Sequence, residues 1–143
     1  MEGMPVPDRR LTVLTGAALD AAWQVVAPLL DKALAHSEAE LTSTDIRDLA
    51  AQGLAFVLVI MRDNDVLAAG AFEIVQYPRY KAANIIAVGG RRVFLRRDEL
   101  AWLQMLARDM GCVKVQTYCR PSMARLLERL GMREAYRVMR CDL

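Results

Sequence analysis

The stretch VKVQTYCRPSMARLLERLGM, residues 113–132, decides the fold of this chain. Its first seven residues, 113–119, have the composition of a strand. Pro121 follows at the favoured first position of a helix, where its missing N–H costs nothing. Apolar residues then recur at helical spacing and are expected to face inward: Met123, Leu126, Leu127 and Leu130. With Gly131 ending the helix, the stretch predicts a strand followed at once by a helix.

The same signals predict the other elements on either side of this stretch. Strands are expected at 11–14, 54–61, 66–76, 82–88 and 134–142, and helices at 17–35, 43–52 and 98–110. Thr42 begins a run typical of helix caps, Asp98 is the expected cap of the helix at 98–110, and Pro28 should kink or split the first helix. The apolar run 54–61 is typical of a strand buried on both faces.

This order of elements predicts the class of fold. Hairpins in the middle of the chain and strand–helix–strand crossovers at its end indicate an α+β domain, with helices on both faces of a mixed central sheet. We expect residues 11–143 to form a single domain. Residues 1–10, which contain Pro5 and Pro7, are expected to form an extended N-terminal arm.

Composition excludes several classes of protein. The chain has 143 residues, 55% of them hydrophobic and 25% charged, which fits one globular domain. A net charge of +2 and scattered arginines do not favour nucleic-acid binding. The longest apolar run has 8 residues, far short of the ~20 that a membrane-spanning helix needs. No secretory leader pattern is present at the N-terminus, so we expect a soluble protein with no membrane partner.

The cysteines and the histidine do not suggest a metal site. Cys112, Cys119 and Cys141 lie outside any metal-binding spacing, and His36 is the single histidine. We therefore predict no metal and no structural disulfide. His36 is expected at the surface, at the end of a helix.

Residues 120–132 resemble a signature of the GNAT superfamily of N-acetyltransferases, and the order of elements resembles that of the same superfamily. The resemblance covers residues 11–143 and implies a GNAT-like (acyl-CoA N-acyltransferase) fold. The small GNAT-like proteins of tailed bacteriophages and prophages are similar to this chain over residues 45–53, 72–78, 89–90 and 107–112 and at Arg120. That closer likeness implies a place in the host cytoplasm or in the virion.

The resemblance implies a cofactor loop after the strand at 82–88. In catalytic GNAT enzymes a Q/R-x-x-G-x-G/A loop opens into a helix, whose amides bind the pyrophosphate of acetyl-CoA. Here Gly89, Gly90, Arg91 and Arg92 occupy that position, without the family spacing and well before the helix. They are candidates for binding phosphate, and the alternative is a glycine turn followed by a solvated basic loop.

The family's usual general acid is a tyrosine in the last helix, and Leu127 stands in its place here. A leucine cannot protonate a leaving thiolate. Tyr118, at the end of the preceding strand, is the candidate substitute, unless it is a core-edge residue. Cys119 beside it is a weaker candidate as a nucleophile, because the chain's single imidazole lies far away in sequence.

Glu73 is the candidate general base. Strand alternation places it on one face with Ala69, Ala71 and Val75, so its carboxylate has small apolar neighbours. The alternative is a structural carboxylate paired with Lys81 or Arg79. Asn84, a polar residue in an apolar strand, must satisfy its amide at a bulge or a ligand.

Two functions follow from these residues. The first is an acyl-CoA-dependent N-acyltransferase in which a split pair of strands holds acetyl-CoA, with weak or lost catalysis because the cofactor loop is degenerate. The second is a non-catalytic phage component, bound to the virion or to another protein. In that case the N-terminal arm, through Arg9 and Arg10, would join phage structural proteins or a second copy of the chain.

Overall fold

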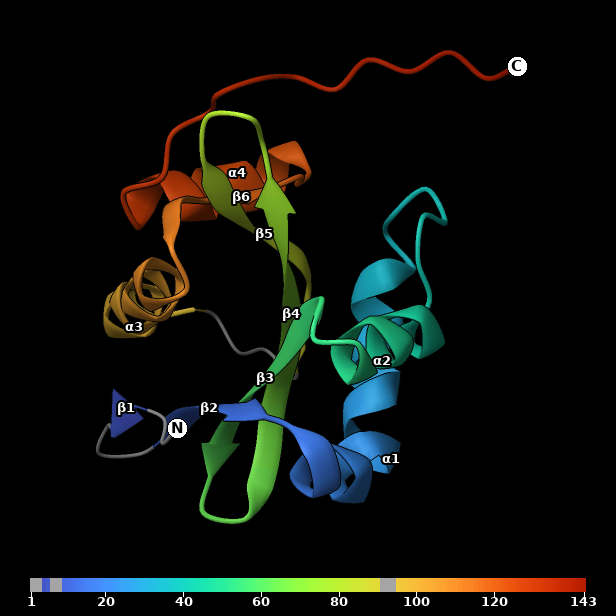
Figure 1. Cartoon of the computed structure of the whole chain (residues 1–143), viewed down its shortest axis with the longest axis vertical. Coiled ribbons are helices and arrows are strands. Elements are labelled where there is room, and N and C mark those ends of the chain that lie inside the picture. The colour runs from blue at the N-terminus through green and yellow to red at the C-terminus, as the bar shows by residue number, and fades with distance from the viewer. Residues whose placement is uncertain (1–3, 6–8, 91–94) are drawn as a thin grey trace.

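The computed structural model describes residues 4–5, 9–90 and 95–143, and a mixed sheet lies at its centre (Figure 1). The sheet has six strands in chain order: β1 (Met4–Pro5), β2 (Arg10–Leu14), β3 (Ala55–Arg62), β4 (Asp65–Gln76), β5 (Lys81–Gly90) and β6 (Cys112–Thr117). All neighbours are antiparallel except β5 and β6, which are parallel. A parallel pair needs a crossover, and the chain makes it through a helix.

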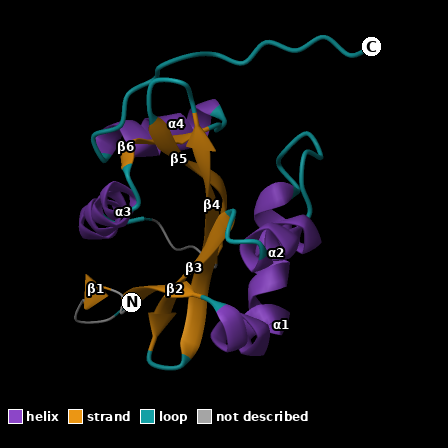
Figure 2. Ribbon diagram, viewed as in Figure 1, coloured by secondary structure: helices purple, strands orange, loops and turns teal. Residues whose placement is uncertain are grey.

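Helices cover both faces of the sheet (Figure 2). They are α1 (Gly16–Leu34), α2 (Ser43–Ala51), α3 (Arg97–Asp109) and α4 (Pro121–Arg129). Helices α1 and α2 pack on one face, and α3, the crossover between β5 and β6, packs on the other. The predicted α+β fold, with a mixed sheet between helices, is confirmed.

Strand β3 separates two apolar cores. Val57 and Val59 belong to the cluster beneath α1 and α2, whereas Leu58 and Ile60 belong to the cluster beneath α3. Because alternate side chains of a strand point to opposite faces, a strand buried on both faces must be apolar at every position. This explains the unbroken apolar run that the sequence shows.

Of the first two helices, α2 follows its sequence signals and α1 departs from them at its proline. The Thr42 hydroxyl accepts from the Asp45 amide at 3.2 Å, and the Thr42 amide donates to the Asp45 carboxylate at 2.9 Å, which forms a capping box. Helix α1 continues through Pro28, so of the two expectations, a kink or a split, the split is wrong. Val26 and Leu30, on either side of the proline, are fully buried, and this packing supports the helix across it.

The cap of α3 differs from the prediction. The helix begins at Arg97 with Arg96 at the N-cap, rather than at Asp98. The Arg96 amide donates to the Glu99 carboxylate at 2.9 Å, so the acidic residue that caps the helix lies one position later than predicted.

The C-terminal part of the chain departs furthest from the prediction. Residues 134–142, expected as a final strand, pair with no strand that the structure describes, and residues 133–143 are exposed throughout. Helix α4 forms as predicted but buries none of its residues, so its apolar stripe does not enter the core. Figure 1 shows the segment after α4 running away from the sheet to the C-terminus.

Candidate functional site

The parallel strands β5 and β6 part halfway along β5. Their pairing runs from Lys81 with Cys112 to Ile85 with Thr117, while β5 continues to Gly90. The Thr117 hydroxyl donates to the Ile85 carbonyl at 3.0 Å and closes the paired end. Beyond it, residues 87–90 have a strand partner on the β4 side only, within the described part of the chain. The backbone edge of β5 is therefore free to pair with an extended ligand.

A bulge lies at the same level of the sheet. Ala71 pairs with Ala87 and Phe72 pairs with Ile85, so β5 carries one extra residue, Ile86, opposite this step of β4. Bulges redirect side chains and often lie beside active sites. The parting of the strands and the bulge thus mark one place in the sheet.

Glu73 lies next to this place. It pairs across the sheet with Ala55 on one side and with Asn84 on the other, and Asn84 is in register with Gln116. This row lies on the face that carries α1 and α2, because alternation places Glu73 with Ala71 of that cluster. Glu73 is half-buried and Asn84 is 7% exposed.

Glu73 contacts an uncharged side chain rather than a cation. Asn84 Nδ2 donates to Glu73 Oε1 at 3.1 Å, and neither Lys81 nor Arg79 forms an ion pair with Glu73 in the described residues. Asn84 Oδ1 is buried and has no hydrogen-bond partner in the described part of the chain. A buried acceptor without a partner carries a cost of about 1–3 kcal/mol, which a ligand that donates to it would remove.

Tyr118 follows the last residue of β6 and is 70% exposed. This exposure does not fit the alternative interpretation of Tyr118 as a residue at the edge of the core. Desolvation, and then the negative charge of Glu134, raise the pKa of the neighbouring Cys119 thiol. This is opposite to the depressed pKa that an activated cysteine nucleophile needs.

The two glycines of the candidate cofactor loop lie in β5 and are tightly packed. A Cβ on Gly89 would lie 2.1 Å from the Leu29 carbonyl oxygen of α1, and one on Gly90 would lie 2.7 Å from the Ala68 Cβ. Close approach of α1 and β4 therefore accounts for glycine at both positions. Arg91 and Arg92, the other two candidates, lie outside the described residues.

A buried ion pair at the start of α3 was not predicted from the sequence. The Arg9 side chain donates through both Nε and Nη2 to the Glu99 carboxylate, with Nε at 2.8 Å from Oε2. Glu99 is 1% exposed and Arg9 8%. Glu99 also accepts a hydrogen bond from the Arg96 amide. Its carboxylate therefore occupies the helix N-terminus, where an anionic ligand could otherwise bind. The sequence signal that could have indicated a role for Glu99 is its position three residues after the helix cap, the spacing of a capping box.

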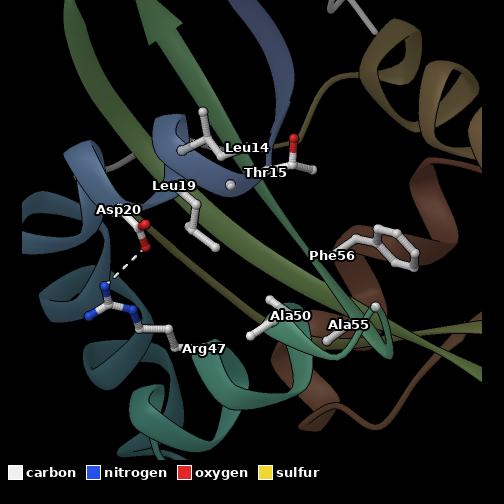
Figure 3. A pocket seen from close by; sticks show the side chains of 11 residues that line it. Leu14, Thr15, Leu19, Asp20, Arg47, Ala50, Ala55 and Phe56 are labelled. Atoms are coloured by element: carbon white, nitrogen blue, oxygen red, sulfur yellow. Dashed lines mark hydrogen bonds and ion pairs between the residues drawn. The ribbon is translucent and has the colours of Figure 1, made fainter.

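A cavity of about 290 Å³ lies between the ends of β2 and α2 and the starts of α1 and β3 (Figure 3). Its polar group is an ion pair, Arg47 Nη2 to Asp20 Oδ1 at 3.1 Å, and its remaining lining is mostly apolar. The Arg47 guanidinium also lies 5.2 Å from the Trp23 ring centroid, a cation–π distance. The lining includes Ala55, the register partner of Glu73, so the cavity opens on the same face of the sheet.

The remaining candidates fall outside the site. His36 is exposed just after α1, where its backbone carbonyl accepts from Arg120 at 3.0 Å. The described residues contain no group of three His, Cys, Asp or Glu side chains placed to hold a metal ion. Nor does this part of the chain contain a helix long and apolar enough to cross a membrane.

Comparison with solved structures shows a GNAT acetyltransferase fold. The aminoglycoside N-acetyltransferase AAC(6')-Iy, solved in complex with CoA, superposes at a TM-score of 0.74, with 12% identity over 98% of both chains. A Trypanosoma brucei acetyltransferase gives 0.69 and 21% identity over 95% of this chain and 100% of that one. Glucosamine-6-phosphate N-acetyltransferase from Arabidopsis thaliana gives 0.68 and 19%, over 94% and 97%. At such identities the likeness concerns the fold.

No protein-family model matches the chain, and no curated protein sequence matches it.

Proposed function

We propose that this chain transfers an acyl group from acyl-CoA to a primary amine. One observation carries the proposal: the free edge of β5, beyond Ile85, begins beside the Glu73–Asn84 pair. An extended ligand that bears amides, such as the arm of acetyl-CoA, suits a free strand edge. The likeness of the fold to acetyltransferases, one of them in complex with CoA, supports the same assignment.

The residues at this place fit such a ligand. Residues 86–90 offer backbone donors and acceptors on the side that β6 has left. Asn84 Oδ1 offers a buried acceptor that lacks a donor in the described chain. Acetyl-CoA, when bound, would supply an acyl thioester, whose acyl group an amine accepts as the C–S bond breaks.

Glu73 is assigned the role of general base in this reaction. Its carboxylate would take the proton that the attacking amine releases, while Asn84 holds one carboxylate oxygen in position. Tyr118, which is exposed at the end of β6, is assigned the role of the acid that protonates the leaving thiolate. Gly89, Gly90, Arg91 and Arg92 remain the proposed contacts for the phosphates.

We further propose that cofactor binding is weak. In catalytic GNAT enzymes the start of the helix after this strand binds pyrophosphate, but here the Glu99 carboxylate accepts the Arg96 amide at that helix start. A phosphate would therefore share the helix N-terminus with a buried carboxylate. This observation also favours the second candidate, a non-catalytic binding component. The origin of the chain in a phage or prophage stays a prediction.

Calorimetric titration with acetyl-CoA at low salt tests the proposal. We expect saturable binding, together with release of free thiol when primary amines are supplied. Desulfo-CoA, which lacks the thiol, is the control for binding that does not lead to transfer. Absence of binding at millimolar acetyl-CoA would overturn the acyltransferase assignment. Binding without thiol release for any amine would support the non-catalytic candidate.

A further inference from the structure

We propose that the amine accepted in this reaction carries a carboxylate at the far end of an apolar body, and that the cavity of Figure 3 binds it. The amine would lie beside Glu73, the apolar body would fill the cavity, and Arg47 would bind the carboxylate. The inference rests on the proposed acyl transfer and goes further, because it names the chemical class of the acceptor. Three observations carry it: the place of the cavity, the chemistry of its lining and the contacts of Arg47.

The cavity adjoins the candidate base through Ala55. This residue lines the cavity and pairs in register with Glu73, and neighbouring strands of a sheet lie about 5 Å apart. On its other side Glu73 pairs with Asn84 of β5, the strand whose free edge is assigned to acyl-CoA. The cavity and the cofactor edge therefore lie on opposite sides of Glu73, which places the base between the two reactants.

Most of the cavity wall is apolar. Its volume of about 290 Å³ lies near the lower end for small-molecule sites, so the body of its ligand must be small. The apolar side chains that line it are Leu14, Leu19, Ala50, Ala51, Ala55 and Phe56. Figure 3 shows the Asp20–Arg47 pair on one side of the cavity and Phe56 on the other. Such a wall suits a molecule with an apolar body and one charged end.

Arg47 has donors to spare for a ligand. Its guanidinium lies 5.2 Å from the Trp23 ring centroid and donates through Nη2 to Asp20 Oδ1 at 3.1 Å. A guanidinium has several further N–H donors, and those of Arg47 have no partner in the described part of the chain. A carboxylate matches this planar group, because it can accept two parallel hydrogen bonds from it. Trp23 and Asp20 thus hold the guanidinium at the cavity and leave it able to bind a carboxylate.

The surroundings of Arg47 favour an anion over a second cation. The Asp20 side chain is 67% exposed, so water screens its attraction for Arg47. The cavity also includes the start of α1, at Thr15 and Gly16, and the N-terminal end of a helix carries partial positive charge. No acidic residue lies in the first turn of α1, and the Thr15 side chain does not cap it. The positive charge around the cavity therefore exceeds the negative charge of Asp20.

Titration of the cofactor-free full chain with hexanoate tests the site without any reaction. In ¹⁵N NMR spectra, millimolar hexanoate should shift the Arg47 Nε–H signal and the Ala50 amide to saturation, whereas hexylamine and hexanol should shift them far less. Arg47→Gln should weaken hexanoate binding about tenfold or more. Arg108→Gln, at an exposed position of α3 on the other face of the sheet, is the control and should leave binding unchanged. Unmoved signals, or hexylamine binding as tight as that of hexanoate, would refute the inference.

The variant Asp20→Asn distinguishes the two charges that the cavity could bind. If Arg47 binds a carboxylate, removal of the competing negative charge of Asp20 should leave hexanoate binding equally tight or tighten it. A thermal scan of the variant should show the fold intact, because the ion pair that is lost is exposed. A tenfold loss of hexanoate binding in this variant, or a gain of hexylamine binding over hexanoate, would contradict the assignment of Arg47.

Acyl transfer from acetyl-CoA tests the link between the cavity and Glu73. The KM for 6-aminohexanoate should lie about tenfold or more below that for hexylamine, and Arg47→Gln should remove this difference with little change in kcat. Ala50→Leu, which fills the cavity, should raise KM for both amines, whereas Ala50→Ser, of nearly the same size as the wild type, should not.

The two proposals fail in different ways in these experiments. Equal KM values for the two amines in the wild type would refute the class of acceptor and leave acyl transfer standing. Saturable binding of hexanoate without transfer to any amine would refute the proposed function, and with it the role of the cavity as an acceptor site, while the carboxylate site at Arg47 would stand.

Discussion

Asn84 donates its side-chain amide to the Glu73 carboxylate, and its own carbonyl oxygen is left buried with no partner in the described residues. The donor end of the amide is thus held by a candidate base, and the acceptor end is left without a donor. Native proteins rarely leave a buried acceptor unsatisfied, and functional sites are a common reason for the exception. This pair is therefore the starting point for testing the site.

Glu73→Gln should abolish acyl transfer and leave the fold intact. The glutamine can still accept from Asn84 but cannot take a proton from an amine, so we expect kcat to fall by about 10²–10⁴-fold. Thiol release gives kcat, and a thermal scan should show a melting temperature within a few degrees of the wild type. If activity falls only in proportion to the folded fraction, the role of Glu73 is structural.

Gly89→Ala should destabilise the protein, whether or not a cofactor binds. The new Cβ would meet the Leu29 carbonyl at 2.1 Å, which α1 can avoid only by moving, and such overpacking costs about 1–3 kcal/mol or more. Urea unfolding measures the loss. Val88→Ala, at a 48% exposed position of the same strand, is the control and should change stability far less. Equal stability of the two variants would contradict the packing explanation.

Glu99→Gln should be strongly destabilising, because it leaves the buried Arg9 guanidinium without a counter-charge. Loss of one partner of a buried ion pair costs about 3–5 kcal/mol, whereas replacement of both by apolar residues is often nearly neutral. We therefore expect the double variant Arg9→Met, Glu99→Leu to recover most of the stability in urea unfolding. A single variant that costs less than ~1 kcal/mol would show that the pair is solvated.

Cys119 should be alkylated slowly at neutral pH, although this residue is exposed. Its raised pKa means that less of the thiol is present as thiolate at pH 7, and the thiolate is the reactive form. The rate with iodoacetamide, followed by mass spectrometry of the Cys119 peptide, should rise as pH increases past the range of an ordinary cysteine. A rate at pH 7 above that of a free cysteine peptide would contradict this and reopen the nucleophile interpretation.

The sequence predicts the central fold well, because local and tertiary signals agree there. Thr42 and Asp45 cap α2 as expected, and the apolar run of β3 is buried on both faces. Where a residue's role depends on distant parts of the chain, prediction from the sequence fails. Nothing near Arg9 in sequence indicates Glu99, and nothing near Gly89 indicates the Leu29 carbonyl.

Prediction from the sequence fails for a different reason in the C-terminal segment. Its residues have the preference for a strand, but a strand forms only where a second edge is available to pair with it. In the described structure this segment pairs with no strand, so residues 134–142 do not form the predicted strand. For Glu73 the sequence could place the residue on a face, whereas its contact with Asn84 depends on the register of β4 and β5.

The ion pair between Arg9 and Glu99 also sets an order of events during synthesis. The two residues are 90 positions apart, and ribosomes add about 5–20 residues per second, so Arg9 emerges on the order of 5–20 s before its partner. Until Glu99 follows, burying the Arg9 cation on the half-made sheet is unfavourable. We therefore expect the start of β2, which follows Arg9, to dock late, only after the crossover helix that carries Glu99 has been made.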